Sequence, residues 1–255
     1  MKQQPVLIED GDPLPPTRMA MGRDSQAPGL LAVGGQLTPA RLTEAYRHGV
    51  FPWFSDGQPV LWWSPEPRMV LATQSFKLSR SLRKTLKRFI LSPTCSVTID
   101  TAFERVIATC AETSRQGQAG TWIVPEMVAA YTRWHTLGAV HSVETWIDGE
   151  LAGGLYGVSL GTMFFGESMF SHQTDASKIA LAALVAFGRA NRIEMIDCQQ
   201  NTGHLASMGA REVSREVFEN HVAQAVQQTP PADWTYHGAH WSHLGIFDHS
   251  SAEPT

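Results

Sequence analysis

The sequence predicts an α+β protein, in which a mixed or antiparallel sheet is flanked by helices and preceded by a small N-terminal domain. The chain has 255 residues, of which 43% are hydrophobic and 17% charged, and this length and composition suit either one large domain or a large one plus a small one. Strand-like runs joined by tight turns follow one another over residues 141–170. Helical patterns precede these runs and an apolar helical pattern follows them at 175–191, so helices should cover the sheet.

The composition also narrows the classes of function. The formal net charge is −4, so contact with nucleic acid must come from a local patch of positive charge. Three widely spaced cysteines, Cys95, Cys110 and Cys198, form no CxxC pair, which favours a reducing compartment over a disulfide framework. No secretory signal is visible after Lys2, and nowhere do about 18 apolar residues follow one another. These features predict a soluble, cytoplasmic protein without a membrane span.

The N-terminal section, residues 1–68, is predicted to be a small domain with an irregular start. Residues 1–28 are rich in Pro, Gly and Asp, which favours loops. A helix should follow, because Thr38 is a suitable N-cap, Pro39 suits the first turn, and Gly49 suits the position after the last turn. The next segment, VFPWFSDGQPVLWWSPEPRMVL, is rich in Trp and turn residues, so it either packs in a core or forms one wall of a pocket.

The second section, residues 69–255, should form the larger domain. Asp100 is the expected N-cap of one of its helices. The order of elements is helices, an antiparallel meander, a buried helix, a strand and a short helix, which is similar to the order in GNAT-like acyltransferase domains. The tail after about residue 230 shows no pattern and is assigned to no element. The predicted helices cover 79–89, 100–114, 125–138, 175–191, 204–210 and 216–228, and a further strand covers 193–199.

Six basic residues lie in one short stretch between Lys77 and Arg88, while no acidic residue lies between Glu66 and Asp100. Helical spacing places five of the six on one face, where like charges repel one another. This face is either solvated and neutralised by acidic residues from elsewhere, or it binds the phosphates of a nucleic-acid backbone. Its five residues are Arg80, Arg83, Lys84, Lys87 and Arg88.

Two apolar strands carry polar residues that buried strands seldom have. Glu167 interrupts a run of Met and Phe, and strand alternation predicts that it shares a side with Phe165 and Met169. A carboxyl group in such a place is either paired with a cation or has a raised pKa. Asp197 and Gln199 end another apolar strand, and because they are two residues apart, alternation predicts that they face the same way.

These polar residues have two interpretations. They form either a hydrogen-bond network that ties the strands to a helix end, or a pocket that positions an amine and accepts its proton. Other chemistries fit poorly, because GxSxG, HExxH and phosphate-loop motifs are absent. RQGQAG at 115–120 is a poor match to an acetyl-CoA loop, which argues against a coenzyme A site. His237, His240 and His243 have metal-like spacing without a carboxylate partner, so no metal site is predicted.

Several long and unusual motifs lie between residues 29 and 219. They are GLLAVGGQLTPARLTEAYRHGVFPWFS, LWWSPEPRMVL, GTWI, GGLYGVSLGTMFFGESMFS, DASK, and IDCQ followed by T-x-H-L-x-S-M-G-A. These motifs resemble the leucyl/phenylalanyl-tRNA–protein transferase family. The resemblance implies a GNAT-like catalytic domain that uses no coenzyme A and no other cofactor. It also implies transfer of Leu or Phe, and less well Met, from aminoacyl-tRNA to proteins that begin with Arg or Lys, within the bacterial N-degron route of protein degradation.

The resemblance implies roles for particular residues as well. The basic helix would bind tRNA phosphates, and the acyl donor would be the ester at the tRNA 3′ end. The terminal adenosine is expected against Trp53, Trp122 and Phe164. Family members usually carry Arg at the position of His172. The side-chain pocket, which should favour Leu, Phe and Met over β-branched residues, is expected to be lined by Leu155, Leu181, Leu184 and Ile196.

The implied reaction is direct aminolysis of the aminoacyl ester by the α-amine of the acceptor. Gln199 would orient or polarise the reacting groups, Asp197 would hold Gln199 and draw off proton charge, and Glu167 would anchor the cationic end of the acceptor. Two rival interpretations stand beside this one. An acyl-CoA-dependent N-acyltransferase is disfavoured by the missing acetyl-CoA loop, and a non-catalytic RNA-binding protein leaves the three polar residues without a purpose.

Overall fold

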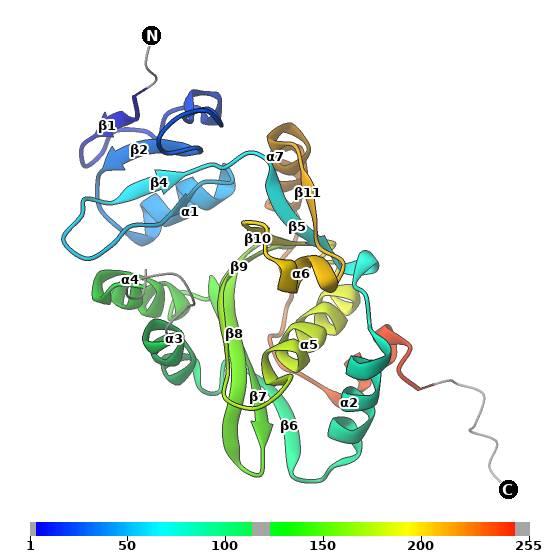
Figure 1. Ribbon diagram of the computed structural model, residues 1–255. Helices are drawn as coiled ribbons and strands as arrows, with labels where there is room; N and C mark the ends of the chain where they lie inside the picture. Colours follow the sequence, from blue (N-terminus) through cyan, green and yellow to red (C-terminus); the bar gives the residue numbers. More distant parts are fainter. Residues whose placement is uncertain (1–3, 114–122, 248–255) are drawn as a thin grey trace, which may run out of the picture.

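The computed structural model describes residues 4–113 and 123–247, which form two sheets with helices packed against them (Figure 1). The first sheet has four strands in the order β1-β2-β4-β3, and α1 contacts both β3 of this sheet and α4 of the larger half. Thr38 caps α1 as predicted, because its hydroxyl accepts a hydrogen bond from the backbone N–H of Arg41. The elements are β1 Val6–Ile8, β2 Leu30–Gly34, α1 Pro39–Arg47, β3 Phe51–Pro52 and β4 Leu61–Trp63.

The second sheet has seven strands in the order β11-β5-β10-β9-β8-β7-β6. Only β9 and β10 are parallel, and α5 connects them. The predicted meander is confirmed as β7, β8 and β9, whereas β5, β6 and β11 were not predicted. The strands are β5 Arg68–Ala72, β6 Cys95–Ile99, β7 Val140–Ile147, β8 Glu150–Leu160, β9 Met163–Ser171, β10 Met195–Gln199 and β11 Arg211–Val213.

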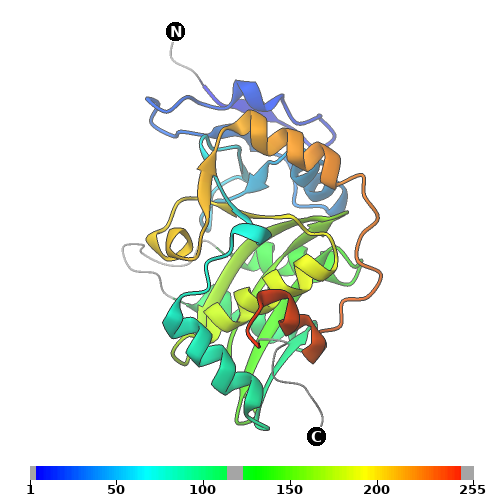
Figure 2. The same cartoon turned by 90° about the vertical axis from the view of Figure 1, so that its right-hand side faces the viewer.

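Helices cover both faces of the larger sheet, so the predicted α+β class is confirmed (Figures 1 and 2). α5 and α2 pack in the core on one face, and α3 and α4 pack in the core on the other. The N-terminus of α5 lies directly on β8 at Gly153, where an added Cβ would be 2.7 Å from the Cβ of Ala176. The helices are α2 Arg80–Leu91, α3 Phe103–Glu112, α4 Pro125–His135, α5 Ala176–Ala190, α6 Gly203–Ser207 and α7 Arg215–Ala225.

The C-terminal tail, which the sequence assigned to no element, packs on α5 and α2. It contains a 3₁₀ helix at Gly238–Leu244 that contacts α5. The Trp234 ring stacks on the His141 ring with centroids 3.6 Å apart. The Arg83 guanidinium donates a hydrogen bond of 2.6 Å to the backbone carbonyl of Gly245. The described part of the tail, up to residue 247, therefore packs on the larger half, beside the basic helix (Figure 2).

The predicted N-cap role of Asp100 is wrong. α3 begins at Phe103, its N-cap is Ala102, and no side chain caps it. Asp100 instead adopts a left-handed conformation with φ 57° and binds β7, where its carboxylate accepts hydrogen bonds from the Ser142 backbone N–H at 2.8 Å and from His141 Nδ1 at 2.6 Å. Tertiary hydrogen bonds thus take the carboxylate that a local rule would give to the helix.

Three expectations from the sequence concern membrane spans, disulfides and metal sites. No helix in residues 4–113 and 123–247 is long and apolar enough to cross a membrane. All three cysteines are free thiols. Within the same ranges, no cluster of His, Cys, Asp and Glu has the arrangement that a metal ion needs, and the evenly spaced histidines of the tail are included in that statement.

Candidate functional site

A cavity of about 370 Å³ lies where β8, β9 and β10 meet α5 and α6. Its wall is mostly apolar, and the small N-terminal section contributes Phe51 and Trp53 to it. Of the residues expected around the adenosine, Trp53 and Phe164 line the cavity, while Trp122 lies outside the described residues. The cavity also brings together Leu155, Leu181, Leu184, Ile196, Glu167, Asp197 and Gln199.

Irregularities in two neighbouring strands bring polar side chains together at this cavity. The register of β9 against β8 shifts by one residue at Glu167, which is therefore the extra residue of a bulge. The register of β10 against β5 shifts between Asp197 and Gln199, and Gln199 has a φ of 59°. Bulges re-aim side chains and are common beside active sites. As a result, Gln199 Nε2 donates a hydrogen bond of 3.2 Å to Glu167 Oε1.

The bulges overturn the predicted alternation of side chains. Phe165 was expected to share a side with Met169, but Phe165 packs in the core beside α3 and α4, whereas Met169 packs against the core built on α5. The extra residue at Glu167 shifts every later side chain to the opposite face. The register of β10 also shifts between Asp197 and Gln199, yet both residues line the cavity.

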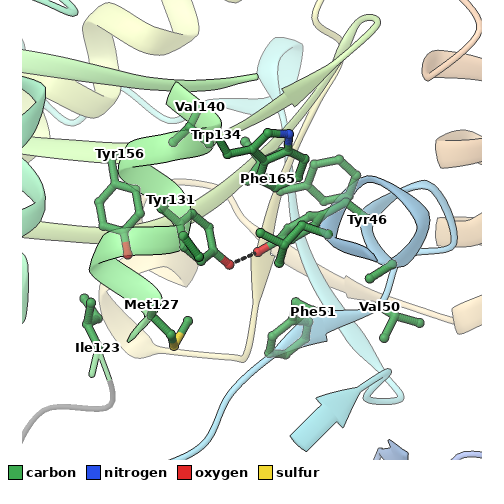
Figure 3. Close-up of a cluster of buried hydrophobic side chains, with 14 of the residues drawn as sticks. Tyr46, Val50, Phe51, Ile123, Met127, Tyr131, Trp134, Val140, Tyr156 and Phe165 are labelled. Atoms are coloured by element: carbon green, nitrogen blue, oxygen red, sulfur yellow. Dashed lines mark hydrogen bonds between the residues drawn. The ribbon is translucent and has the colours of Figure 1, made fainter. Parts of the chain in front are cut away.

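The Glu167 carboxyl group is buried and receives hydrogen bonds from uncharged groups. Tyr46 of α1 donates to Oε1 at 2.7 Å, and Tyr131 of α4 donates to Oε2 at 3.4 Å. The two tyrosine hydroxyls also meet each other (Figure 3). Burial raises the pKa of Glu167 to about 8; the Tyr46 hydrogen bond lowers it, and the nearby Asp197 charge raises it. Of the two alternatives predicted for this carboxyl group, the structure favours the raised pKa over a cationic partner.

The Asp197 carboxyl group has a different environment. It is fully buried and forms two hydrogen bonds with the Arg68 guanidinium, from Nε at 2.8 Å and from Nη2 at 2.6 Å. Asp197 Oδ1 also accepts a hydrogen bond of 2.9 Å from the backbone N–H of Gln199. The sequence analysis missed Arg68. The signal that could have found it is a basic residue at the start of an apolar strand, since a buried cation needs a buried anion.

The arrangement suits acid–base work at an amine better than nucleophilic catalysis by the protein. The Cys198 thiol faces the same cavity, but burial raises its pKa well above the usual range, so it stays protonated and is a poor nucleophile. In its ionised form Glu167 can accept a proton or attract a cation, and Gln199 can donate or accept a hydrogen bond. A substrate that fills the apolar part of the cavity would place its polar end against these two residues.

The basic helix is α2, and its two faces have different environments. Leu82, Leu86 and Phe89 are buried in the core. None of the five cations on the other face forms an ion pair with a described residue, which weakens the interpretation that acidic residues neutralise them. Arg83 bonds to the tail, and the four exposed residues of the face are Arg80, Lys84, Lys87 and Arg88.

Comparison with known proteins gives a consistent family. A family model described as leucyl/phenylalanyl-tRNA protein transferase matches residues 70–223, and one described as the N-terminal domain of that transferase matches residues 35–66. A leucyl/phenylalanyl-tRNA–protein transferase from Methylibium petroleiphilum is 66% identical over 240 residues, which cover 94% of this chain and 91% of the relative. One from Leptothrix cholodnii is 58% identical over 253 residues, 98% of each chain.

Solved structures resemble this chain only distantly. A conserved protein of unknown function from Bacteroides thetaiotaomicron has 12% sequence identity and a TM-score of 0.33, and the match covers 66% of this chain and 57% of that protein. A likeness this low carries no argument about fold or function. The family therefore rests on the sequence relatives and on the matched family models.

Proposed function

Since this chain belongs to the leucyl/phenylalanyl-tRNA–protein transferase family and is a transferase, we propose that it moves Leu or Phe, and less well Met, from aminoacyl-tRNA to the α-amine of proteins that begin with Arg or Lys. The observation that carries this proposal is the cavity, which is mostly apolar and has a polar corner where Glu167 and Gln199 meet. An apolar chamber suits the donor side chain, and the polar corner suits a cationic acceptor.

The donor half of the proposal places the aminoacyl end in the apolar part of the cavity. Trp53 and Phe164 offer aromatic surfaces for the terminal adenosine. A pocket of this kind selects by fit, and a misplaced methyl group costs about 1–3 kcal/mol. Unbranched-at-β side chains therefore enter more easily than Ile or Val. The pocket residues are Leu155, Leu181, Leu184 and Ile196.

The acceptor half of the proposal depends on Glu167. Its carboxyl pKa of about 8 matches the pKa of a protein α-amino group, about 7.7–8.0. Matched values favour proton transfer between the two groups. The acceptor amine attacks the ester carbonyl, a C–N bond forms, the bond to the ribose oxygen breaks, and the amine proton passes to Glu167 or to the leaving oxygen. Gln199 orients the amine, and because an ester is already activated, positioning supplies much of the rate.

The exposed cations of α2 are proposed to bind tRNA phosphates. Neutralising Lys84, Lys87 and Arg88 to Gln should weaken tRNA binding and flatten its dependence on salt, because each lost phosphate contact reduces the slope of log K against log salt by about 0.7–0.9. Fluorescence anisotropy with labelled tRNA at several salt concentrations measures the slope. The matched control replaces three exposed arginines of the N-terminal section; an equal change there would contradict the proposal. These control positions are Arg18, Arg23 and Arg47.

The same proposal covers the domain organisation, the compartment and the pathway of the enzyme. We infer that residues 69–255 form a GNAT-like catalytic domain and residues 1–68 a small N-terminal domain. The confirmed order of meander, buried helix and strand supports the first inference, and the four-stranded sheet within residues 6–63 supports the second. The enzyme is proposed to act in the cytoplasm, without coenzyme A or another cofactor, and to mark its products for degradation by the N-degron route.

A transfer assay tests the proposed function directly. Purified protein is incubated with radiolabelled Leu-tRNA and with a peptide that begins with Arg, beside the same peptide beginning with Ala. Label should move to the Arg peptide alone, and free coenzyme A should not affect transfer. Gln199→Ala should retain tRNA binding while losing transfer. If tRNA binds to the parental protein but no label reaches the peptide, the RNA-binding alternative replaces this proposal.

A further inference from the structure

We propose that Arg68 is a positioning residue for the transfer reaction: it neutralises Asp197 and locks it in place, so that Asp197 holds the backbone of Gln199 rather than the acceptor. This inference rests on the proposed function and assigns different tasks to the two carboxyl groups of the cavity. Glu167 is left, among the described residues lining the cavity, as the carboxyl group without a cationic hydrogen-bond partner.

The first step from Arg68 to the reaction is its contact with Asp197. Two parallel hydrogen bonds, from Nε to Oδ1 and from Nη2 to Oδ2, fix both the position and the plane of the carboxylate. Arg68 is 1% exposed and Asp197 is fully buried. A cation on an acceptor peptide therefore meets a carboxylate that is already neutralised and enclosed.

The second step is how Arg68 itself is held. Its guanidinium carbon lies 4.8 Å from the centroid of the Phe51 ring and 4.5 Å from that of Phe218. Phe51 belongs to β3 of the small sheet and lines the cavity, whereas Phe218 belongs to α7. Arg68 thus connects the cavity wall of the N-terminal section to the polar corner of the larger sheet. Lysine carries the same charge but has neither the fork nor the planar group.

The third step leads from Asp197 to Gln199. Asp197 Oδ1 accepts the Gln199 backbone N–H, and Gln199 keeps a left-handed conformation that a residue with a side chain seldom adopts. That conformation presents the Gln199 amide to Glu167. If the carboxylate were free to rotate, the anchor of this bulge would be lost. Arg68 therefore acts on the reaction through two residues, without touching a substrate itself.

Stability alone does not explain the pair. Buried ion pairs are commonly replaced by apolar residues of similar size with little loss of stability. The third guanidinium nitrogen of Arg68, Nη1, is buried and bonds to no described residue, which is an unfavourable feature in a purely structural pair. An arrangement that leaves a buried donor unsatisfied is better explained by the orientation that it gives to Asp197.

The test replaces both partners at once, with Arg68→Met/Asp197→Leu, so that neither charge is left unpaired in the core. A structural role predicts that this folded variant transfers label at the parental rate. The positioning role predicts that kcat falls about 100-fold, the usual effect of misplacing a reacting group, while the KM for the Arg peptide changes little. A parental kcat in the folded double variant would overturn the inference.

A second measurement does not depend on activity. In protein labelled with ¹⁵N at glutamine side chains, the Gln199 amide signals are identified by their disappearance in Gln199→Ala. They should be shifted from free-amide positions in the parental protein and return to those positions in the double variant. Unchanged signals in the double variant would overturn the inference even if transfer itself had failed in the parental protein, so the two failures are distinguishable.

The conservative variant Arg68→Lys covers the case in which the double variant does not fold. Lysine keeps a cation beside Asp197 but loses the two-point fork and the planar group over the phenyl rings. We expect kcat to fall about tenfold, with an unchanged KM for the Arg peptide and Gln199 amide signals part of the way to the free positions. Parental values of both quantities would contradict a positioning role.

Discussion

Glu167 and Asp197 are carboxyl groups on neighbouring strands, and they differ in their partners more than in their burial. Glu167 is 5% exposed and Asp197 is fully buried. Asp197 faces a guanidinium that holds both of its oxygens, whereas Glu167 faces two phenols and an amide. Burial disfavours the charged form of any acid, whereas an opposite charge or hydrogen bonds to the charged form favour it. In this sheet, one buried carboxyl group is therefore held by a cation and the other by neutral hydrogen-bond donors.

This difference assigns the two groups to different tasks. A carboxyl group held at both oxygens by a guanidinium is useful as an anchor, and Asp197 anchors the backbone of Gln199. A titrating group can exchange protons with an amine, and Glu167 has a pKa of about 8.

The largest effect should appear in the free energy of unfolding. Asp197→Ala leaves the Arg68 charge buried without a partner, which should cost about 3–5 kcal/mol. Glu167→Gln replaces a largely neutral acid by a neutral amide, so its cost at neutral pH should be below about 1 kcal/mol. Urea unfolding of the two variants beside the parental protein measures both values. Equal costs would mean that the two carboxyl groups have similar environments after all.

The second effect concerns the reaction. Glu167→Gln removes the group proposed to attract the acceptor and accept its proton, so kcat/KM for an Arg peptide should fall about 100-fold. The matched control is Glu144→Gln, since Glu144 is another buried carboxyl group with a raised pKa, held by Ser142 and Thr98 outside the cavity. A control variant as inactive as Glu167→Gln would attribute the loss to folding instead of to the site.

The third effect is the pH dependence of stability. Between the usual pKa of a glutamate, 4.5, and the folded value of about 8, the native protein holds a proton on Glu167 that the unfolded chain releases. Stability from this group is therefore complete below the lower value and is lost as pH rises through the higher one, by about 1.4 kcal/mol per pH unit. Glu167→Gln should remove this part of the slope in urea unfolding across that range. A slope equal to that of the parental protein would show that Glu167 is ionised in the folded state.

Whether a residue of this site could be predicted from the sequence depends on how far along the chain its hydrogen-bond partners lie. Glu167 and Gln199 were found because a polar residue in an apolar strand needs an explanation, and that is a local observation. The hydrogen-bond partners of Glu167 and Asp197 were not predicted. Tyr46 lies 121 positions from Glu167, and Arg68 lies 129 positions from Asp197, so only the folded chain shows that they meet.

In the fold, too, features that depend on neighbouring residues were predicted, and features that depend on distant contacts were missed. α1 was predicted because Thr38 satisfies a backbone N–H of its own first turn. Asp100 was misassigned because its carboxylate is bound by β7, some forty residues along the chain. The bulge at Glu167 was also invisible, because nothing in an alternating pattern shows that one residue is extra. Local rules gave the elements, and tertiary hydrogen bonds determined the site.

The smallest effect distinguishes the hydrogen bonds that Tyr46 and Tyr131 donate to Glu167. Tyr46 donates at 2.7 Å and Tyr131 at 3.4 Å, and both hydrogen bonds lower the pKa of the carboxyl group. A hydrogen bond contributes about 0.5–1.5 kcal/mol, equivalent to about one pKa unit or less. Tyr46→Phe should therefore move the midpoint at which kcat/KM rises with pH upward by up to about one pH unit, and Tyr131→Phe by less.

The pH profile of transfer to one Arg peptide measures both midpoints, and because the peptide is the same throughout, a difference reports on the enzyme. Tyr236→Phe is the matched control, since it removes a buried hydroxyl from the C-terminal tail and leaves Glu167 untouched. A larger shift for Tyr131→Phe than for Tyr46→Phe would reverse the order that the two distances predict. No shift in either variant would mean that the titrating group of the reaction is the acceptor amine, and Glu167 would then join Asp197 as a carboxyl group whose task is to hold other residues in place.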